Sequence, residues 1–252
     1  MLSTKDLALL GQKGISEKQI EEQLDCFRKG FPFLEIMASA SVEKGISVID
    51  KEAQVGYMEA WDAYLNQNKR ILKFVPASGA ASRMFKDLYE FLDSDSNEPF
   101  SPFMEKFFAG LTSFAFYNAL DAVCLKNEKR TIPQLLSDKE YKAVVNNLLS
   151  SSGLNYGQLP KGLLQFHTYP ACVRTAMEEH LAEGAMYAKN NAAEVNIHFT
   201  VSPEHKALFE QLVAAKVPAY ENKFSVCYDI TFSVQKPSTD TLAADSENQP
   251  FR

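Results

Sequence analysis

Apolar residues recur at helical spacing through the first seventy residues of the chain. Ser16 and Gln19 form a capping-box pattern, which marks the start of a helix. The apolar positions that follow, at 20, 24 and 27, lie three or four residues apart. A second stripe with similar spacing consists of Val55, Met58, Trp61 and Leu65. We therefore expect residues 1–70 to form an N-terminal helical extension.

The pattern changes to that of strands at residue 71. Residues 71–75 are a short apolar run closed by Pro76, residues 195–201 alternate between apolar and polar positions, and residues 224–234 predict a further strand. A capping box at Thr175 and a cap at Ser202 begin helices between these strands. Strands that alternate with helices predict βαβ units and a mostly parallel sheet, so we expect residues 71–252 to form an α/β domain.

A mainly helical block interrupts the α/β pattern at about residues 93–157, between two polar linkers. Ser101 and Pro102 begin a helix there, and the phenylalanines that follow are expected to form the core of the block. The uncharged run of residues 107–120 predicts a buried helix, because it is too short to span a membrane. Residues 132–150 are expected to be helical too. The block is thus predicted to be a helical insertion in the α/β domain.

Composition narrows the class of protein. The 252 residues carry 26 lysines and arginines against 32 aspartates and glutamates, a formal charge of −6. This balance argues against a dedicated nucleic-acid binder, because phosphate backbones select for basic surfaces. The sequence shows no apolar signal segment and predicts no membrane span. The cysteines lack a paired spacing and are expected to be small core residues of a cytoplasmic protein: Cys26, Cys124, Cys172 and Cys227.

Positive charge is concentrated in two stretches that contain no acidic residue, residues 69–86 and 141–177. The first stretch contains the small-residue sequence Ala77-Ser78-Gly79-Ala80-Ala81-Ser82, followed by Arg83, between a predicted strand and a predicted helix. Backbone N–H groups at a helix start are free and favour anions, so this segment is a candidate phosphate-binding loop. The guanidinium of Arg83 is placed to bind a phosphate oxygen.

The same loop permits a purely structural interpretation, a tight strand-to-helix turn with small residues for packing and a surface arginine. It is not a P-loop, since no Gly-Lys-Ser or Gly-Lys-Thr follows, and it lacks the three glycines of a dinucleotide-binding fingerprint. The loop alone leaves the two interpretations open.

Val75 to Met84 resembles the signature loop of the sugar-phosphate nucleotidyltransferases, in which a strand is followed by small residues with glycine and then by Ser or Thr, Arg and Met. The second half of that signature is a Pro-Lys followed by small and apolar residues, and the sequence around Lys161 is similar to it. A later turn resembles the base-binding turn of that family through Gln235, Ser238 and Thr239. The whole chain resembles a family of uncharacterised bacterial proteins with a UDP-sugar pyrophosphorylase-like core.

This resemblance implies a nucleotide-diphospho-sugar transferase-like fold, a three-layer α/β fold with a mostly parallel sheet. The chain departs from the family pattern where Ala80 or Ala81 replaces a second glycine and where Ser238 replaces a glycine. The helical block also separates the two halves of the signature, which normally lie close together. The family's metal-binding aspartate follows a further strand, which is absent before Arg252, so a truncated C-terminus is expected.

The resemblance implies a reaction in which a sugar 1-phosphate attacks the α-phosphate of a nucleoside triphosphate and pyrophosphate leaves. Arg83 and Lys161 would be the catalytic residues, Arg83 on the leaving pyrophosphate and Lys161 on the α-phosphate or the attacking phosphate. The Gly79 loop would bind the triphosphate, and Mg²⁺ would bridge phosphate oxygens through ligands that the sequence does not identify. The alternative is a non-catalytic nucleotide- or phosphosugar-binding module that retains the loop.

The histidines show no spacing typical of a metal site: His167, His180, His198 and His205. His180 lies among glutamates on a predicted helix, which favours a solvated or helix-packing side chain. His198 and His205 lie near the end of a predicted strand, and a structural role is favoured for both. Ser78 and Ser82 have no evident His–Asp partners, so the sequence does not support a hydrolase triad.

Overall fold

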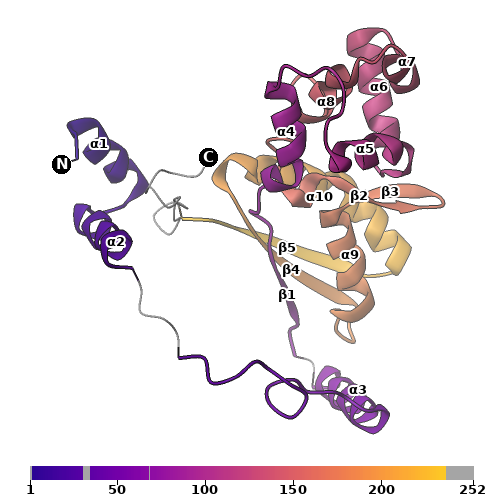
Figure 1. Cartoon of the computed structure of the whole chain (residues 1–252). Coiled ribbons are helices and arrows are strands. Elements are labelled where there is room, and N and C mark those ends of the chain that lie inside the picture. The colour runs from indigo at the N-terminus through magenta and orange to yellow at the C-terminus, as the bar shows by residue number, and fades with distance from the viewer. Residues whose placement is uncertain (1, 31–34, 68, 237–252) are drawn as a thin grey trace. The chain divides into compact units, whose positions relative to one another are not determined.

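The computed structural model describes residues 2–30, 35–67 and 69–236 (Figure 1). These residues divide into two units. Leu65–Val234 forms one unit, and the described residues on either side of it belong to the other. In the described part of the chain, no helix combines the length and the apolar character needed to cross a membrane.

The N-terminal helices begin at well-formed caps. Helix α1 (Thr4–Lys13) is capped by Ser3 and helix α2 (Glu17–Lys29) by Ser16, each through a complete capping box. Helix α3 (Lys51–Leu65) carries the second predicted stripe. None of these three helices has a buried side chain, so their apolar stripes are at most partly covered.

Three parallel strands form the sheet of the unit Leu65–Val234, in the order β1 (Leu72–Pro76), β4 (Glu194–Val201) and β5 (Cys227–Val234). Helix α9 (Ala176–Tyr187) leads into β4, and helix α10 (Lys206–Phe224) connects β4 to β5. This arrangement confirms the α/β class and the parallel sheet. An antiparallel hairpin of β2 (Gln165–Tyr169) and β3 (Cys172–Thr175) precedes α9.

The alternation of side chains along the strands gives the sheet two different faces. Val75, Ile197 and Phe199 lie on one face, where α9 and α10 both pack against the strands and enclose a buried apolar cluster. Phe74 and His198 lie on the other face, where their rings stack with centroids 5.5 Å apart. In the unit Leu65–Val234, Phe74 remains 59% exposed.

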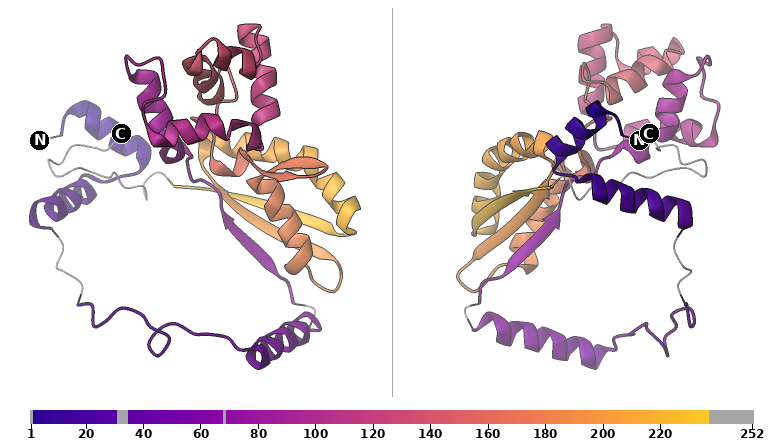
Figure 2. Two further views of the ribbon diagram at one scale, coloured as in Figure 1. Left: turned by 45° about the vertical axis from the view of Figure 1, so that its right-hand side comes forward. Right: turned by 90° about the vertical axis from the view of Figure 1, so that its left-hand side faces the viewer.

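The helical block forms a second, separate core. Four helices of the block build it, α5 (Pro102–Ala109), α6 (Tyr117–Glu128), α7 (Ile132–Ser137) and α8 (Tyr141–Leu149), together with α4 (Lys86–Asp93), which precedes the block in the sequence. Their buried residues form one cluster that extends from Ala81 to Leu164. Figure 2 shows the block as a distinct group of helices beyond the end of the sheet at which β1 ends.

One prediction inside the block is wrong because local turn residues override the apolar pattern. Residues 107–120 do not form one buried helix: α5 ends at Gly110, a 3₁₀ turn (Leu111–Ser113) follows, and α6 begins only at Tyr117. Residues 132–150 are helical as expected, in two helices, α7 and α8, because Lys139 between them has a φ of 60° that no α-helix accommodates.

The prediction of core cysteines holds for Cys124 alone. Cys124 lies buried in α6. Cys172 and Cys227 are exposed at the starts of β3 and β5, and Cys26 in α2 is only partly covered. The low polarity of cysteine favours burial, but the position of each residue in its element decides it.

Candidate phosphate-binding site

The loop after β1 and the segment around Lys161 lie side by side, although the helical block separates them in the sequence. The backbone N–H of Lys161 donates a hydrogen bond to the carbonyl of Gly79 at 3.0 Å, and Ala80 pairs with Pro160 in an isolated antiparallel bridge. The block therefore leaves the α/β core and returns to it at adjacent points. As a result, the two segments that resemble the halves of the nucleotidyltransferase signature meet.

The small residues of the loop have different environments. Ala77 and Ser78 are partly buried and Gly79 and Ala80 are exposed, whereas Ala81 is buried at 1% exposure in the core of the helical block. A Cβ atom added to Gly79 would meet no atom within 4 Å, and its φ is not in the left-handed region. The fold itself therefore does not require a glycine at this position, which leaves room for a ligand to approach the backbone.

The helix start differs from the predicted one. Ser82 and Arg83 belong to a 3₁₀ turn (Ser82–Phe85), and α4 begins only at Lys86. The N–H of Met84 already donates to the carbonyl of Ala81 at 2.9 Å. The loop thus leads into a 3₁₀ turn and not directly into an α-helix, so fewer free N–H groups are aligned than the sequence led us to expect.

Several cations of the two acid-free stretches pair with acidic residues from other parts of the unit. Arg70 contacts Asp229 at 2.7 Å, Lys73 forms an ion pair with Glu183, and Arg174 contacts Glu179 at 3.3 Å. The side chains of Arg83 and Lys161 are exposed, and neither makes an ion pair or hydrogen bond with any residue that the structure describes. Their positive charges are therefore not neutralised by described acidic groups and remain available to an anion.

The predicted base-binding turn cannot be compared with this geometry. Ser238 and Thr239 lie outside the described residues. Gln235 directly follows β5 in the chain and belongs to the other unit.

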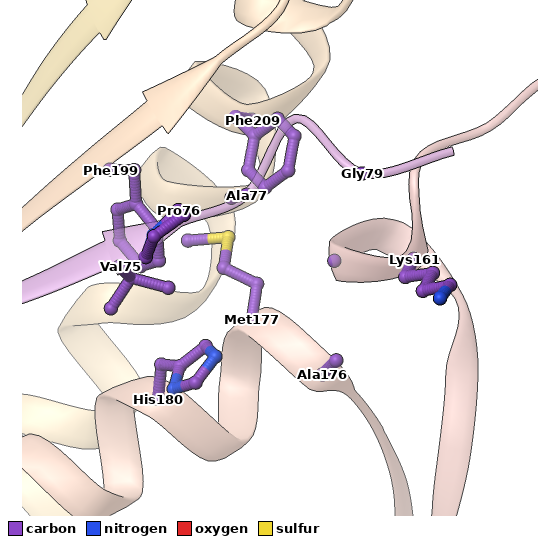
Figure 3. A pocket seen from close by; sticks show the side chains of 11 residues that line it. Val75, Pro76, Ala77, Gly79, Lys161, Ala176, Met177, His180, Phe199 and Phe209 are labelled. Carbon is purple, nitrogen blue, oxygen red and sulfur yellow. The ribbon is translucent and has the colours of Figure 1, made fainter. Parts of the chain in front are cut away.

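A cavity of about 150 Å³ opens beside the loop, at the carboxyl end of β1 (Figure 3). Ligands of parallel α/β proteins bind at this end of the strands. The cavity is lined by residues of β1, the loop, the Lys161 turn, α9, β4 and α10: Val75, Pro76, Ala77, Gly79, Lys161, Gly162, Ala176, Met177, His180, Phe199 and Phe209. Figure 3 shows the Lys161 side chain at one side, directed away from Met177 and His180.

His180, for which the sequence favoured a solvated or helix-packing side chain, is one of the residues that line the cavity. It is partly buried and lies on the same side of α9 as Met177, three positions earlier, and Gly184, four positions later. That spacing was visible in the sequence and could have placed His180 on the inner side of the helix. Its ring lies 6.3 Å from that of Phe199, centroid to centroid.

Glu183 links His180 to a charged network on the covered face of the sheet. Its Oε2 atom contacts Nδ1 of His180 at 3.1 Å and accepts hydrogen bonds from Lys73 and from the hydroxyl of Tyr187, the latter at 2.9 Å. Partial burial disfavours the charged form of Glu183, but the hydrogen bonds from Lys73, Tyr187 and His180 outweigh it and lower the pKa from 4.5 to about 2. Glu183 is therefore a carboxylate at neutral pH.

The described residues do not supply a metal cage. No group of three or more His, Cys, Asp or Glu side chains among them lies close enough together to hold a metal ion. The described residues thus do not form a site that would hold Mg²⁺ through protein ligands alone.

The model of a domain of unknown function, DUF4301, matches residues 3–252. The chain belongs to this family. No curated protein and no solved structure matches the chain. The description of this family names no activity.

Proposed function

We propose that this protein is a nucleotidyltransferase that joins a nucleoside triphosphate and a sugar 1-phosphate and releases pyrophosphate. The observation that carries the proposal is the meeting of two cationic segments distant in sequence, the Gly79 loop with Arg83 and the turn with Lys161, at the carboxyl end of a parallel strand. Both segments resemble parts of one nucleotidyltransferase signature, and the hydrogen bond between Lys161 and Gly79 joins them.

In the proposed reaction, a phosphate oxygen of the sugar 1-phosphate attacks the α-phosphorus, and the bond to the bridging oxygen of pyrophosphate breaks. The protein positions the substrates and neutralises their charge. Arg83 stabilises the leaving pyrophosphate, and Lys161 stabilises the α-phosphate or the attacking phosphate. The open space at Gly79 lets the triphosphate approach the loop backbone.

We propose for the same reasons that the protein has the three-layer nucleotide-diphospho-sugar transferase fold and works in the cytoplasm. Parallel sheets are normally covered on both faces. Within Leu65–Val234, α9 and α10 pack on the same face, so the proposal requires a further layer over Phe74 and His198.

Pyrophosphate release tests the reaction. The whole chain is incubated with Mg²⁺, each of the four ribonucleoside triphosphates and a set of sugar 1-phosphates. We expect one combination to release pyrophosphate, and Arg83→Ala or Lys161→Ala to lower the rate about a hundredfold or more, because each removes a positive charge that would stabilise the reacting phosphates. Lys86→Ala is the matched control, since Lys86 is exposed and its ion pair with Glu90 lies on α4.

Full activity of Arg83→Ala would overturn the catalytic assignment. Binding of a triphosphate in a thermal-shift assay without any turnover would favour the non-catalytic binding module instead. No shift with any nucleotide or sugar phosphate would reject both.

A further inference from the structure

The cavity beside the Gly79 loop has very few polar side chains. Among the residues that line it, only Lys161 and His180 carry a side-chain nitrogen or oxygen, and the remaining wall is formed by apolar groups such as Met177, Phe199 and Phe209. Lys161 is exposed and directed away from the inner wall (Figure 3). His180 is therefore the group that can recognise a polar atom of a ligand inside the cavity.

The groups around Glu183 determine which nitrogen of the neutral His180 ring carries the proton. An ionised carboxylate can only accept hydrogen bonds, so the 3.1 Å contact between Glu183 Oε2 and His180 Nδ1 requires the proton on Nδ1. Lys73 and Tyr187 hold the same oxygen in place. When the ring is neutral, Nε2 then carries a lone pair, and in the described part of the chain no residue donates to it.

We propose that His180 is the hydrogen-bond acceptor of this cavity and that it receives an N–H or O–H group on a ring of the bound ligand. The apolar wall covers the faces of the ring, and Nε2 selects rings that present a donor at that position. Glu183 is the positioning residue, since it fixes the tautomer without touching the ligand. The inference rests on the proposed function for the choice of ligands: the ring belongs either to the nucleobase or to the sugar.

Nuclear magnetic resonance of the whole chain with ¹⁵N-labelled histidine tests the tautomer directly. We expect the neutral His180 ring to have an unprotonated Nε2. Glu183→Gln should give a mixture of tautomers, because a glutamine amide can donate to Nδ1 as well as accept from it. His198 is the internal reference, since it lies on the other face of the sheet with both ring nitrogens hydrogen-bonded to Thr231 and Ser233. A protonated Nε2 in the neutral His180 ring would overturn the proposal.

Two sets of ligands then show whether the nucleobase or the sugar provides the ring that His180 binds. The probes are the four ribonucleoside triphosphates with Mg²⁺ in one arm and glucose 1-phosphate and N-acetylglucosamine 1-phosphate in the other. We expect one arm to shift the His180 Nε2 resonance and to leave His198 unchanged. His180→Leu should weaken that ligand about tenfold, the loss of about one hydrogen bond, while His180→Gln should retain most of the affinity because its carbonyl also accepts. His198→Leu should bind as the unaltered protein does.

The two proposals can fail separately. If no pyrophosphate is released but a probe still shifts His180 and loses affinity in His180→Leu, the proposed reaction is wrong and the acceptor role stands. If Arg83-dependent turnover occurs while the His180 resonance stays unchanged at saturation, the acceptor role is wrong and the reaction stands. The absence of any ligand-induced shift in both arms also overturns the acceptor role.

Discussion

The two faces of the parallel sheet are formed by the same three strands but carry different side chains and have different surroundings. On the covered face, Val75, Phe199 and Phe232 lie in one row across β1, β4 and β5, and α9 and α10 enclose them. On the other face, the neighbouring row consists of Phe74, His198 and Thr231. A shift of one residue along each strand thus changes a mostly buried apolar row into a more exposed row of mixed polarity.

The difference shows which face can hold a site rigidly. The side chains of Val75 and Phe199 line the cavity, and their other contacts lie in the buried apolar cluster between the sheet and the two helices, which fixes their positions. The ring of His198 instead bonds to Thr231 and Ser233 at 2.8 and 2.9 Å, which satisfies its polar atoms without any ligand. The covered face therefore carries the candidate site, whereas on the other face the ring nitrogens of His198 have their partners within the sheet.

The largest expected contrast between the faces is in stability. Phe199→Ala should lower the free energy of unfolding by about 3–5 kcal/mol, because Phe199 is fully buried against Phe209 and Phe232. Phe74→Ala should cost about 1 kcal/mol or less, since it removes only a stacking contact of an exposed ring. Urea unfolding followed by circular dichroism measures both. Equal losses would mean that the second face is as closely packed as the first.

A smaller contrast separates two glycines on the covered side. A Cβ atom at Gly184 would lie 2.8 Å from a methyl of Val195, so Gly184→Ala should force α9 away from β4. Overpacking of this kind costs about 1–3 kcal/mol, and the better helix propensity of alanine offsets about 1 kcal/mol of it. Gly79→Ala should leave the melting temperature unchanged, because nothing lies within 4 Å.

Triphosphate binding completes the comparison of the two glycines. In the thermal-shift assay described above, Gly79→Ala should weaken triphosphate binding, whereas Gly184→Ala, once folded, should bind the triphosphate normally. A large drop in melting temperature for Gly79→Ala would contradict the view that this glycine serves a ligand.

The smallest expected effect is the acid dependence of the Glu183 network. Because folding lowers the pKa of Glu183 from 4.5 to about 2, its contribution to stability is complete above about pH 4.5 and is lost as the pH falls toward 2. Glu183→Gln should therefore flatten this part of the stability–pH profile. Exposure of Glu183 to solvent keeps the effect modest. Parallel profiles for the two proteins between pH 5 and 2 would show that the network does not depend on the charge.

Much of the local structure could be predicted because it depends on neighbouring residues. The capping boxes at Ser16 and Thr175 begin α2 and α9 where expected, and the apolar run before Pro76 forms β1. The helix expected over residues 107–120 is an exception. Its buried residues do reach the core of the block, but they lie on both sides of a turn at Gly110, which the apolar pattern does not reveal.

The candidate site likewise consists of residues that could be predicted from the sequence and residues that could not. The loop residues and Arg83 were predicted from the sequence alone, because small residues and a cation directly after a strand indicate a candidate phosphate site without any knowledge of distant contacts. His180 was not, since its proposed role depends on Glu183, whose carboxylate also accepts hydrogen bonds from Lys73 of β1 and Tyr187 of α9.

The sequence by itself therefore determined the α/β class, the parallel sheet and the two segments that resemble one phosphate-binding signature. Only the tertiary structure brought Gly79 and Lys161 within hydrogen-bond distance, left Arg83 without a described partner and placed His180 in the wall of a cavity. The reason is physical: caps, turns and strand patterns act over a few residues, whereas the closure of the helical block and the pairing of charges depend on contacts between distant parts of the chain.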